Sequence, residues 1–273
     1  MKLSEIKFIL EKEGIFPSKG LGQHFLIDDK VFSKIIKASE LKNEDFVLEV
    51  GPGIGNLTIK LAKKVKEVIA IEKDKRMSKI LEKILKEKKI KNVRVFNDDI
   101  LNFLKLNLKL LWPKYKVVSN IPYYLTSRLI RNFLELKKKP EMMVLMVQKE
   151  VAKRICAKPP KMNLLAVSVQ FYAKPEIVAI VPKSSFWPRP KVDSAILKIS
   201  KIKKRKGAKK FFSLVKVGFS SPRKQLLNVF SKSLKIDKLK VKEWLIKCGI
   251  SPNWRAENLQ IKDWLKLLKN PIL

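Results

Sequence analysis

Residues 117–126 read VVSNIPYYLT, an apolar run that ends in an amide, a proline and two aromatic rings. The Asn120 side chain can offer a carbonyl oxygen. The backbone carbonyl of Ile121 can offer a second, because Pro122 fixes its own φ and restricts the residue before it. Tyr123 can stack on a flat base, a contact worth ~1–3 kcal/mol. The segment therefore predicts a clamp for a nucleobase; the alternative is a strand end and turn whose tyrosines pack in the core.

Residues 49–58, EVGPGIGNLT, carry glycines at 51, 53 and 55 between an expected strand and an expected helix. Glycine allows a tight turn and a close approach to a ligand. The dinucleotide fingerprint has its third glycine where Asn56 stands here, so a pyrophosphate ligand is disfavoured. Glu72 ends the next expected strand, where a carboxylate accepts from ribose hydroxyls. Asp99 follows the third strand, where it can accept from an adenine amino group. This set favours an adenosine ligand without pyrophosphate, such as S-adenosylmethionine, over an ordinary strand-to-helix turn.

The two segments together indicate alkylation of an amino group. An adenine amino group is a poor nucleophile because its lone pair is delocalised into the ring, and acceptors at Asn120 and Ile121 would draw that pair out of conjugation. Methyl transfer from a sulfonium needs alignment and electrostatics more than a strong acid or base. The single histidine, His24, and two distant cysteines leave little for a metal cluster, so we expect no metal.

Short β-branched or apolar runs alternate with stretches of helical spacing through the first two thirds of the chain. Such alternation predicts an α/β fold, a mostly parallel sheet with helices on both faces. The expected strands are 45–50, 66–72, 93–97, 116–120 and 142–148, and the clearest helices between them are 56–65 and 75–89. Residues 171–182 and 192–200 are expected to be strands near an edge, with antiparallel pairing.

The C-terminal part has a different composition. Residues 201–210, KIKKRKGAKK, carry seven basic residues and no acid, which is typical of a linker or exposed arm. Helical periodicity follows, and Ser251-Pro252 is a candidate helix start. We therefore expect a first domain over 1–200 and a small all-helical domain, with its linker, over 201–273. The latter range holds 20 Lys and Arg against four Asp and Glu, a net charge of +16.

The whole chain has 61 Lys and Arg against 25 acidic residues and a formal net charge of +36. A field of this sign favours a nucleic-acid partner; the alternatives are a membrane surface or lysine-rich solvated faces without a partner. No apolar run approaches the ~20 residues that span a bilayer, and the N-terminal MKLSEIKFILEKEG lacks a signal-peptide core. We expect a cytoplasmic protein without membrane contact.

The chain resembles the ribosomal RNA adenine N6,N6-dimethyltransferases of the KsgA/RsmA/Dim type, with the Erm methyltransferases as close relatives. The segments that carry the resemblance are KGLGQHFLID (19–28), EVGPGIGNLT (49–58), IEKD (71–74), NDDIL (97–101), SNIPYYLTS (119–127), VQKEVAKRI (147–155), FWPRPKVDSA (186–195) and RAENL (255–259). It implies a Rossmann-like class I methyltransferase domain, S-adenosylmethionine as methyl donor, and dimethylation of two adjacent adenosines in the 3′-terminal hairpin of small-subunit (16S) ribosomal RNA during ribosome biogenesis. The implied partner is that RNA or the pre-30S particle.

The resemblance also implies roles for single residues. The loop that closes over the methyl donor would contain His24 and Leu26. The donor pocket would be lined by Gly51, Glu72, Asp99 and Asn120. The target base would be held by Asn120 and Tyr123, with the ring of Phe186 on its other face. The alternatives are a polar loop residue for His24 and a core residue for Phe186.

Three positions depart from the family pattern and leave the RNA contacts open. Arg128 stands where a proline is common, residues 158–169 lack a usual tyrosine-glycine pair, and Pro222 stands where a second arginine is frequent. Arg223 and Lys224 are therefore the candidate phosphate-binding residues, against the alternative of a solvated basic face.

Other functions remain to be compared with the dimethyltransferase. A non-catalytic RNA-binding assembly factor would have a broken pocket, whereas every pocket position here carries a competent residue. A nicotinamide oxidoreductase is disfavoured by Asn56 and by the single histidine. An Erm-type enzyme acting on large-subunit RNA is the nearest rival, but the long N-terminal lead and the segments 186–195 and 255–259 favour the small-subunit enzyme.

Overall fold

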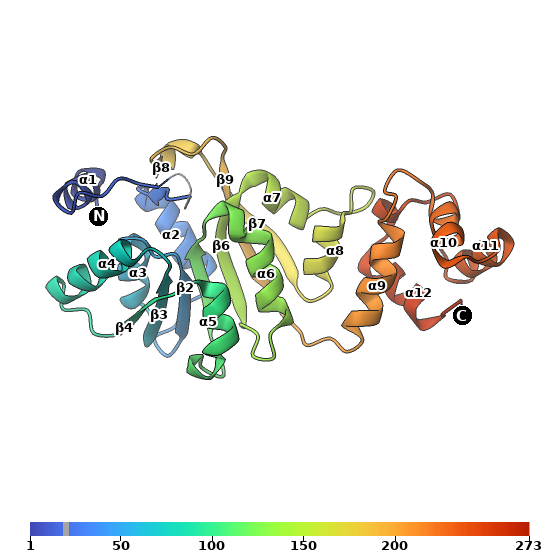
Figure 1. Cartoon of the computed structure of the whole chain (residues 1–273), viewed down its shortest axis with the longest axis horizontal. Helices are drawn as coiled ribbons and strands as arrows, with labels where there is room; N and C mark the ends of the chain where they lie inside the picture. Colours follow the sequence, from blue (N-terminus) through green and yellow to red (C-terminus); the bar gives the residue numbers. More distant parts are fainter. Residues whose placement is uncertain (19–21, 273) are drawn as a thin grey trace. The chain divides into compact units, whose positions relative to one another are not determined.

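The computed structural model describes residues 1–18 and 22–272, so the first three residues of the KGLGQHFLID segment lie outside the described residues. The chain forms two compact units, each of them discontinuous in sequence. The first unit comprises Met1–Ala152 and Pro175–Ile202, and the second comprises Lys153–Lys174 and Lys203–Leu273. Figure 1 gives the labels of the elements.

A seven-stranded sheet forms the centre of the first unit, with the strand order β4-β3-β2-β5-β6-β9-β7. The five strands predicted before residue 150 are all present and shifted by at most one residue, and the two predicted over 171–182 and 192–200 are present with shifts of up to three residues. Strands β2 to β6 pair in parallel, whereas β9 pairs antiparallel with β6 and β7 lies at the edge, as expected. The bounds are β2 (Phe46–Val50), β3 (Glu67–Glu72), β4 (Val93–Asn97), β5 (Lys116–Asn120), β6 (Met142–Gln148), β7 (Lys174–Val181) and β9 (Ser194–Ser200).

The order of the strands places the segments that follow β2 and β5 next to each other. From β2 the chain adds β3 and β4 on one side, and then returns to add β5 and β6 on the other. Ligands of open α/β sheets bind at this kind of reversal, beyond the carboxyl ends of the strands. The register pairs Leu48 with Val117, and the Ser119 hydroxyl donates to the Val50 carbonyl. The glycine loop and the Asn120 segment therefore leave the sheet side by side.

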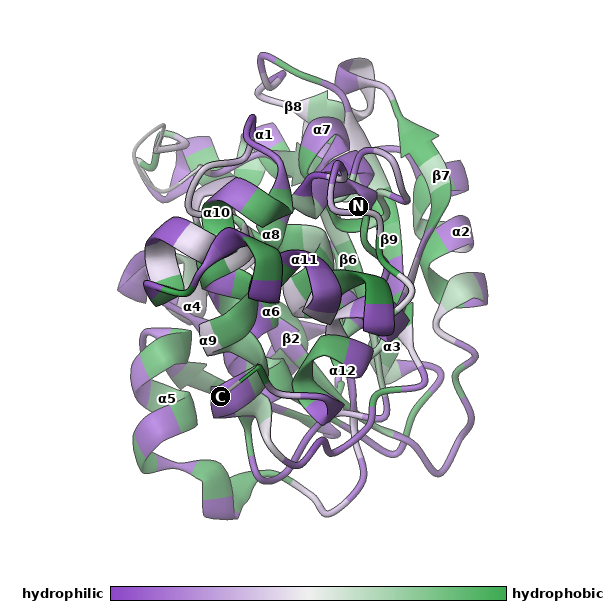
Figure 2. Cartoon of the chain, turned by 90° about the vertical axis from the view of Figure 1, so that its right-hand side faces the viewer, coloured by the Kyte–Doolittle hydropathy of each residue, from purple (hydrophilic) through white to green (hydrophobic). Residues whose placement is uncertain are grey.

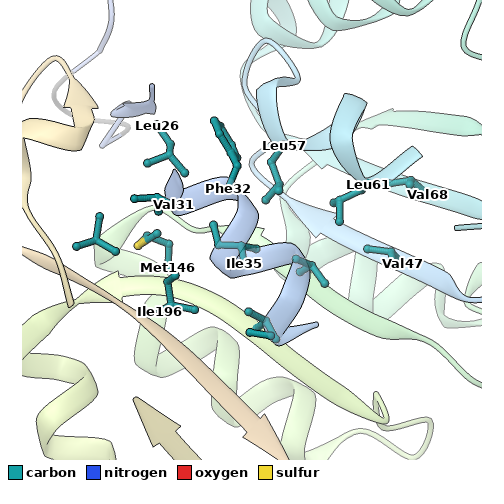
Figure 3. Close-up of a cluster of buried hydrophobic side chains, with 14 of the residues drawn as sticks. Leu26, Val31, Phe32, Ile35, Val47, Leu57, Leu61, Val68, Met146 and Ile196 are labelled. Carbon is teal, nitrogen blue, oxygen red and sulfur yellow. The ribbon is translucent and has the colours of Figure 1, made fainter. Parts of the chain in front are cut away.

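Helices α2 (Asp29–Ala38) and α3 (Asn56–Ala62) pack on one face of the sheet. Figure 3 shows Val31, Phe32 and Ile35 of α2 between the α3 side chains on one side and Met146 and Ile196 on the other. The amino end of α2 is capped by Asp28, whose carboxylate accepts from the Lys30 N–H at 2.9 Å. Such a cap satisfies a backbone donor that the helix leaves free.

Three further helices follow β3, β4 and β5. They are α4 (Lys75–Glu87), close to its predicted range, α5 (Ile100–Leu106) and α6 (Thr126–Glu135). Right-handed crossovers that run in opposite directions along the sheet place α5 and α6 on the face opposite to α3 and α4 (Figure 1). At the amino end of the chain, α1 (Leu3–Lys12) buries Ile6 and Leu10 against Ile80 and Ile84 of α4.

A two-stranded ribbon, which the sequence analysis does not anticipate, joins distant parts of the first unit. Strand β1 (Phe25–Leu26) pairs antiparallel with β8 (Phe186–Trp187), and the register sets Leu26 opposite Phe186. A strand of two residues is too short to show a periodicity in the sequence. Its pairing also depends on a contact between segments 160 positions apart.

The second unit is helical. It contains α8 (Leu164–Gln170), α9 (Ala208–Gly218), α10 (Leu226–Leu234), α11 (Lys238–Lys247) and α12 (Ile261–Lys269), while α7 (Lys149–Ile155) crosses the division between the units. Both α10 and α11 show hydrophobic and hydrophilic stretches (Figure 2). In the core, the ring of Phe171 stacks on that of Phe211 with centroids 4.0 Å apart.

Two features of the second unit differ in detail from the sequence analysis. Residues 153–174 group with the C-terminal helices, and the chain enters this unit again after Ile202, close to the predicted boundary. The helix start predicted at Ser251-Pro252 is wrong, because these residues form a turn closed by a hydrogen bond from the Trp254 N–H to the Ser251 carbonyl. The short 3-10 helix Ala256–Asn258 follows, and the next α-helix, α12, begins only at Ile261. None of the helices in the described parts of the chain is long and apolar enough to cross a membrane.

Candidate active site

A pocket lies at the carboxyl ends of β2, β3 and β5 and is closed on one side by residues 22–26. Its empty volume is about 1010 Å³, including space open to solvent. All the residues predicted to hold the methyl donor line it, and so does one of the two predicted base-binding rings. These residues are His24, Leu26, Gly51, Glu72, Asp99, Asn120 and Tyr123.

The glycine loop between β2 and α3 has the backbone conformation that its sequence predicts. Gly51, Gly53 and Gly55 have φ values of +65°, +58° and +92°, in the region that favours glycine. A Cβ on Gly51 would lie 3.3 Å from Pro122 Cδ, and one on Gly53 would lie 3.2 Å from Phe25 Cε1. The loop therefore accepts close contacts from both neighbouring segments, which side chains would prevent.

The Glu72 carboxylate is fixed by the backbone around it. The side chain is buried, Oε2 accepts from the Gly53 N–H at 2.9 Å, and Oε1 accepts from the Asp74 N–H at 2.9 Å. Burial raises the pKa of Glu72 above its ordinary value, while the backbone hydrogen bonds oppose that rise. Each oxygen has a second lone pair, so Glu72 can still accept from a ligand hydroxyl.

Asp99 has two roles in the structure. It caps α5, since its Oδ1 accepts from the Leu101 N–H at 2.8 Å, and its Oδ2 lies 3.1 Å from Nζ of Lys73. Burial disfavours the charged form, but these two contacts outweigh burial and hold the pKa of Asp99 below its usual value. The carboxylate is therefore ionised and able to accept a hydrogen bond.

Asn120 is oriented by the segment that precedes α2. Its Nδ2 donates to the His24 carbonyl at 3.1 Å, so its Oδ1 is the group left for a ligand. His24 is held in turn, because its Nδ1 lies 2.7 Å from the Pro188 carbonyl, which can only accept. Segments from three distant parts of the sequence thus determine the direction of one amide.

Tyr123 begins the 3-10 helix Tyr123–Leu125 that links β5 to α6. Its hydroxyl lies 2.6 Å from the Ser194 hydroxyl, and its ring stacks on the His24 ring with centroids 5.9 Å apart. Burial raises the pKa of Tyr123, which keeps the phenol neutral. The half-buried ring is therefore held in place while it lines the pocket.

Two of the predictions fall outside the pocket. Phe186 is 3% exposed and belongs to the core cluster around Leu26, Val31 and Phe32, because the β1–β8 pairing turns its ring inward. Phe186 is not among the residues that line the pocket, so its place on the second face of the base stays a prediction. Arg223 and Lys224 are exposed in the loop between α9 and α10 of the second unit.

The sequence analysis missed a group of buried polar atoms beside the glycine loop. Glu49 Oε2, Asn56 Oδ1 and Thr58 Oγ1 are buried without a hydrogen-bond partner, as is one further side-chain atom among the described residues. Burial raises the pKa of Glu49 to about 8. Glu49 and Asn56 line the pocket. The signal was available, because Glu49 is the only acid in EVGPGIGNLT, directly before the first glycine.

The fold and the site define a class of protein. A mostly parallel sheet with an antiparallel β9, a glycine loop after β2 and an acidic side chain at the end of β3 are the features of a class I methyltransferase. The pocket also fits an adenosine-containing methyl donor, because its glycines leave room for a ligand and its lining includes Glu49 and Asn56, each of which has a buried oxygen without a partner.

Comparison with known proteins gives the family. The model of the family described as "Ribosomal RNA adenine dimethylase" matches residues 18–271. The chain belongs to this ribosomal RNA adenine dimethylase family.

Curated relatives and solved structures agree with this assignment. "Ribosomal RNA small subunit methyltransferase A" of Dehalococcoides mccartyi (strain CBDB1) is 44% identical over 269 residues, which are 97% of this chain and 92% of the relative. The protein of the same name from Alkaliphilus metalliredigens is 39% identical, over 97% of this chain and 96% of its own. A dimethyladenosine transferase from Plasmodium falciparum has a TM-score of 0.75 at 31% identity, covering 90% and 96%. The 23S rRNA methyltransferase ErmE has a TM-score of 0.73 at 28% identity, covering 90% and 98%.

Proposed function

We propose that this enzyme uses S-adenosylmethionine to dimethylate N6 of two adjacent adenosines in the 3′-terminal hairpin of small-subunit ribosomal RNA, as a step of ribosome biogenesis. The observation that carries the proposal is the orientation of Asn120. Its Nδ2 is used by the His24 carbonyl, so its Oδ1 is left to accept from an amino group in the pocket. Near-full-length similarity to small-subunit methyltransferases supports the choice of RNA.

The residues at the strand ends would hold the donor. Glu72 accepts from the ribose hydroxyls with the lone pairs that Gly53 and Asp74 leave free. Asp99 accepts from the adenine amino group, and His24 and Leu26 cover the ligand. When bound, S-adenosylmethionine supplies a methyl group on a positively charged sulfur.

Transfer would depend on alignment and on the two acceptors after β5. Asn120 Oδ1 and the Ile121 carbonyl accept from the two N–H groups of the target adenine, which localises its lone pair on N6. N6 then attacks the methyl carbon, the carbon–sulfur bond breaks with its electron pair going to sulfur, and N6 loses a proton to water. Tyr123 stacks on the base, positioned by its contact with Ser194. In the second transfer N6 carries one N–H and one methyl group, so only one of the two acceptors would bind a hydrogen while the methyl group would lie beside the other.

The second unit would supply much of the affinity for RNA. Residues 201–273 have a net charge of +16, and the exposed Arg223 and Lys224 fit a phosphate contact. Phosphate contacts position a protein on RNA without reading its sequence. We therefore assign RNA binding to this part of the chain and base chemistry to the pocket of the first unit.

The test is methylation of small-subunit particles isolated from cells without the corresponding dimethylase. After incubation with the purified protein and donor, mass spectrometry of nuclease fragments should find two adjacent N6,N6-dimethyladenosines near the 3′ end. An Asn120→Ala variant should give none within the same time. Methylation of a single adenine in large-subunit RNA instead would identify an Erm-type enzyme. RNA binding without any methylation would leave an assembly factor.

A further inference from the structure

Asp99, the residue proposed to bind the donor's adenine, is already paired with another side chain of the protein. Asp99 has two carboxylate oxygens, of which Oδ1 caps α5 through the Leu101 N–H. The other, Oδ2, pairs with Nζ of Lys73 at 3.1 Å. If Asp99 is to accept from the amino group of a bound adenine, that group has to share or replace the contact with Lys73.

Lys73 is suited to such a replacement. It follows Glu72 directly, and hydrogen bonds from Asn97 Nδ2 to the carbonyls of Glu72 and Lys73 hold its backbone. Its side chain is 56% exposed, whereas that of Asp99 is 30% exposed. A backbone held by hydrogen bonds and a side chain that is more than half exposed allow Lys73 to change partners while the pocket keeps its shape. Ion pairs of this exposure are weak, so the exchange needs little energy.

After leaving Asp99, the Lys73 ammonium group would bind the RNA backbone outside the pocket. Lys73 and Tyr124 both line the pocket, and Tyr124 is 60% exposed. The positive charge of Arg128 contributes to lowering the pKa of Asp99. An exposed ammonium group and an exposed ring therefore both line the pocket that the target base would enter.

We propose that Lys73 is an exchangeable partner of Asp99. When the donor binds, the amino group of its adenine replaces Lys73 on Asp99, and the Lys73 ammonium group then binds the RNA backbone at the pocket opening. This role rests on the proposed function. Lys73 is then a positioning residue rather than a catalytic one: it touches neither the methyl group nor N6 of the target. It makes donor binding and RNA binding favour each other.

The exchange predicts a selective gain of affinity when Lys73 is removed. Lys73→Met should bind S-adenosylhomocysteine roughly two- to five-fold more tightly, because the competing ion pair is gone. The matched control is Lys75→Met. Lys75 is exposed and lies two residues after Lys73, so this variant removes the same charge. S-inosylhomocysteine is the matched ligand, since it has a carbonyl in place of the amino group and therefore lacks the exocyclic N–H that would donate to Asp99. It should show no gain with Lys73→Met.

The second arm measures the coupling to RNA. In the wild type, saturating S-adenosylhomocysteine should strengthen binding of the small-subunit 3′-terminal hairpin by roughly three- to ten-fold at about 0.1 M salt, the effect of one added phosphate contact. Lys75→Met should keep this coupling, and Lys73→Met should lose it. Titration calorimetry for the nucleosides and fluorescence anisotropy for the RNA give both arms on the full chain.

The outcomes separate this proposal from the proposed function. Unchanged affinity of Lys73→Met for S-adenosylhomocysteine, an equal gain for the inosine ligand, or RNA coupling that survives in Lys73→Met would each overturn the exchange. Methylation by the wild type would still stand in those cases. A wild-type protein that binds no S-adenosylhomocysteine would overturn both.

Discussion

The Asn120 side chain donates to the carbonyl oxygen of His24 at 3.1 Å, across 96 positions of sequence. This contact ties the end of β5 to the segment that covers the pocket, and it decides which end of the amide faces the ligand. A clamp for an amino group needs the oxygen there and not the nitrogen. The orientation of the proposed catalytic amide is therefore a property of the loop around His24 as much as of Asn120.

The glycine loop should be sensitive to a single methyl group. A Cβ on Gly55 would lie 2.4 Å from Cδ1 of Leu81, which is buried against Ala70 and Leu85 and cannot move aside freely. Gly55→Ala should lower the free energy of unfolding by ~1–3 kcal/mol for overpacking, in addition to the ~1–2 kcal/mol of a left-handed residue.

Gly14 provides the matched control, because it has φ +60° with nothing within 4 Å of its would-be Cβ. Gly14→Ala should show the backbone cost alone in chemical denaturation. Equal losses for the two variants would mean that the contact with Leu81 relaxes without cost.

Glu72 should discriminate the donor. Glu72→Ala strands the ribose hydroxyls of the ligand and should weaken donor binding by about 1–3 kcal/mol, measured by titration calorimetry. Glu82→Ala, on the exposed side of α4, controls for the loss of one negative charge. We also expect no binding of NAD, since Asn56 stands at the third position of the fingerprint. Tight NAD binding, or an unchanged donor affinity in Glu72→Ala, would contradict the assignment.

Glu49 should make stability depend on pH. Its pKa rises from 4.5 to about 8 on folding, so the folded state holds a proton that the unfolded state has lost between these values. The contribution of Glu49 is therefore fully present below pH 4.5 and is lost as pH rises toward 8. At ~1.4 kcal/mol for each pKa unit, the loss is on the order of 5 kcal/mol.

Glu49→Gln cannot ionise, so the difference in free energy of unfolding between wild type and variant should change steadily from pH 4.5 to 8 and level off above. Urea denaturation at several pH values measures it, with Glu82→Gln as an exposed control. A constant difference between wild type and Glu49→Gln across this range would show that Glu49 does not carry the proton.

RNA binding should weaken as the salt concentration rises, and it should also weaken when the positive charges in the loop between α9 and α10 are removed. The Arg223→Gln, Lys224→Gln double variant should reduce the slope of log affinity against log salt by about 2 if both residues contact phosphates. Lys238→Gln with Lys240→Gln on α11 removes the same charge from the same unit. Equal losses in the two double variants would mean that the overall positive charge of this unit attracts the RNA, and that Arg223 and Lys224 make no specific phosphate contact. Deletion of 201–273 is a poorer test, because it would remove Phe211 from Phe171.

The features that the sequence predicts correctly are those that depend on residues close together in the chain. The strands are predictable because short β-branched runs between turn residues have few alternative structures. The glycine loop is predictable because its three positive φ values favour glycine over other residues. Glu72 and Asp99 followed from their positions at strand ends. Each of these inferences needs only the neighbours of a residue in the chain.

What escaped the sequence depends on contacts between distant segments. The burial of Phe186 follows from its pairing with Leu26, and the grouping of residues 153–174 with the C-terminal helices follows from packing such as Phe171 on Phe211. Ser251-Pro252 has the residue types of a helix start, yet the chain turns there because the Leu226 N–H bonds to the Trp254 carbonyl. The pairing of Lys73 with Asp99 is equally invisible before the strands are set side by side.

The central claim is that Asn120 stabilises the transition state of methyl transfer, and single-turnover methylation of small-subunit particles by Asn120→Ala tests it most directly. Its contribution grows as N6 becomes tetrahedral and positive, so the rate at saturating donor should fall by ~10²–10³. Binding of RNA and of donor, measured beside it, should change far less, whereas Tyr123→Ala should harm base binding and rate together. A near-normal single-turnover rate in Asn120→Ala would contradict the account and leave NIPYY as a structural turn.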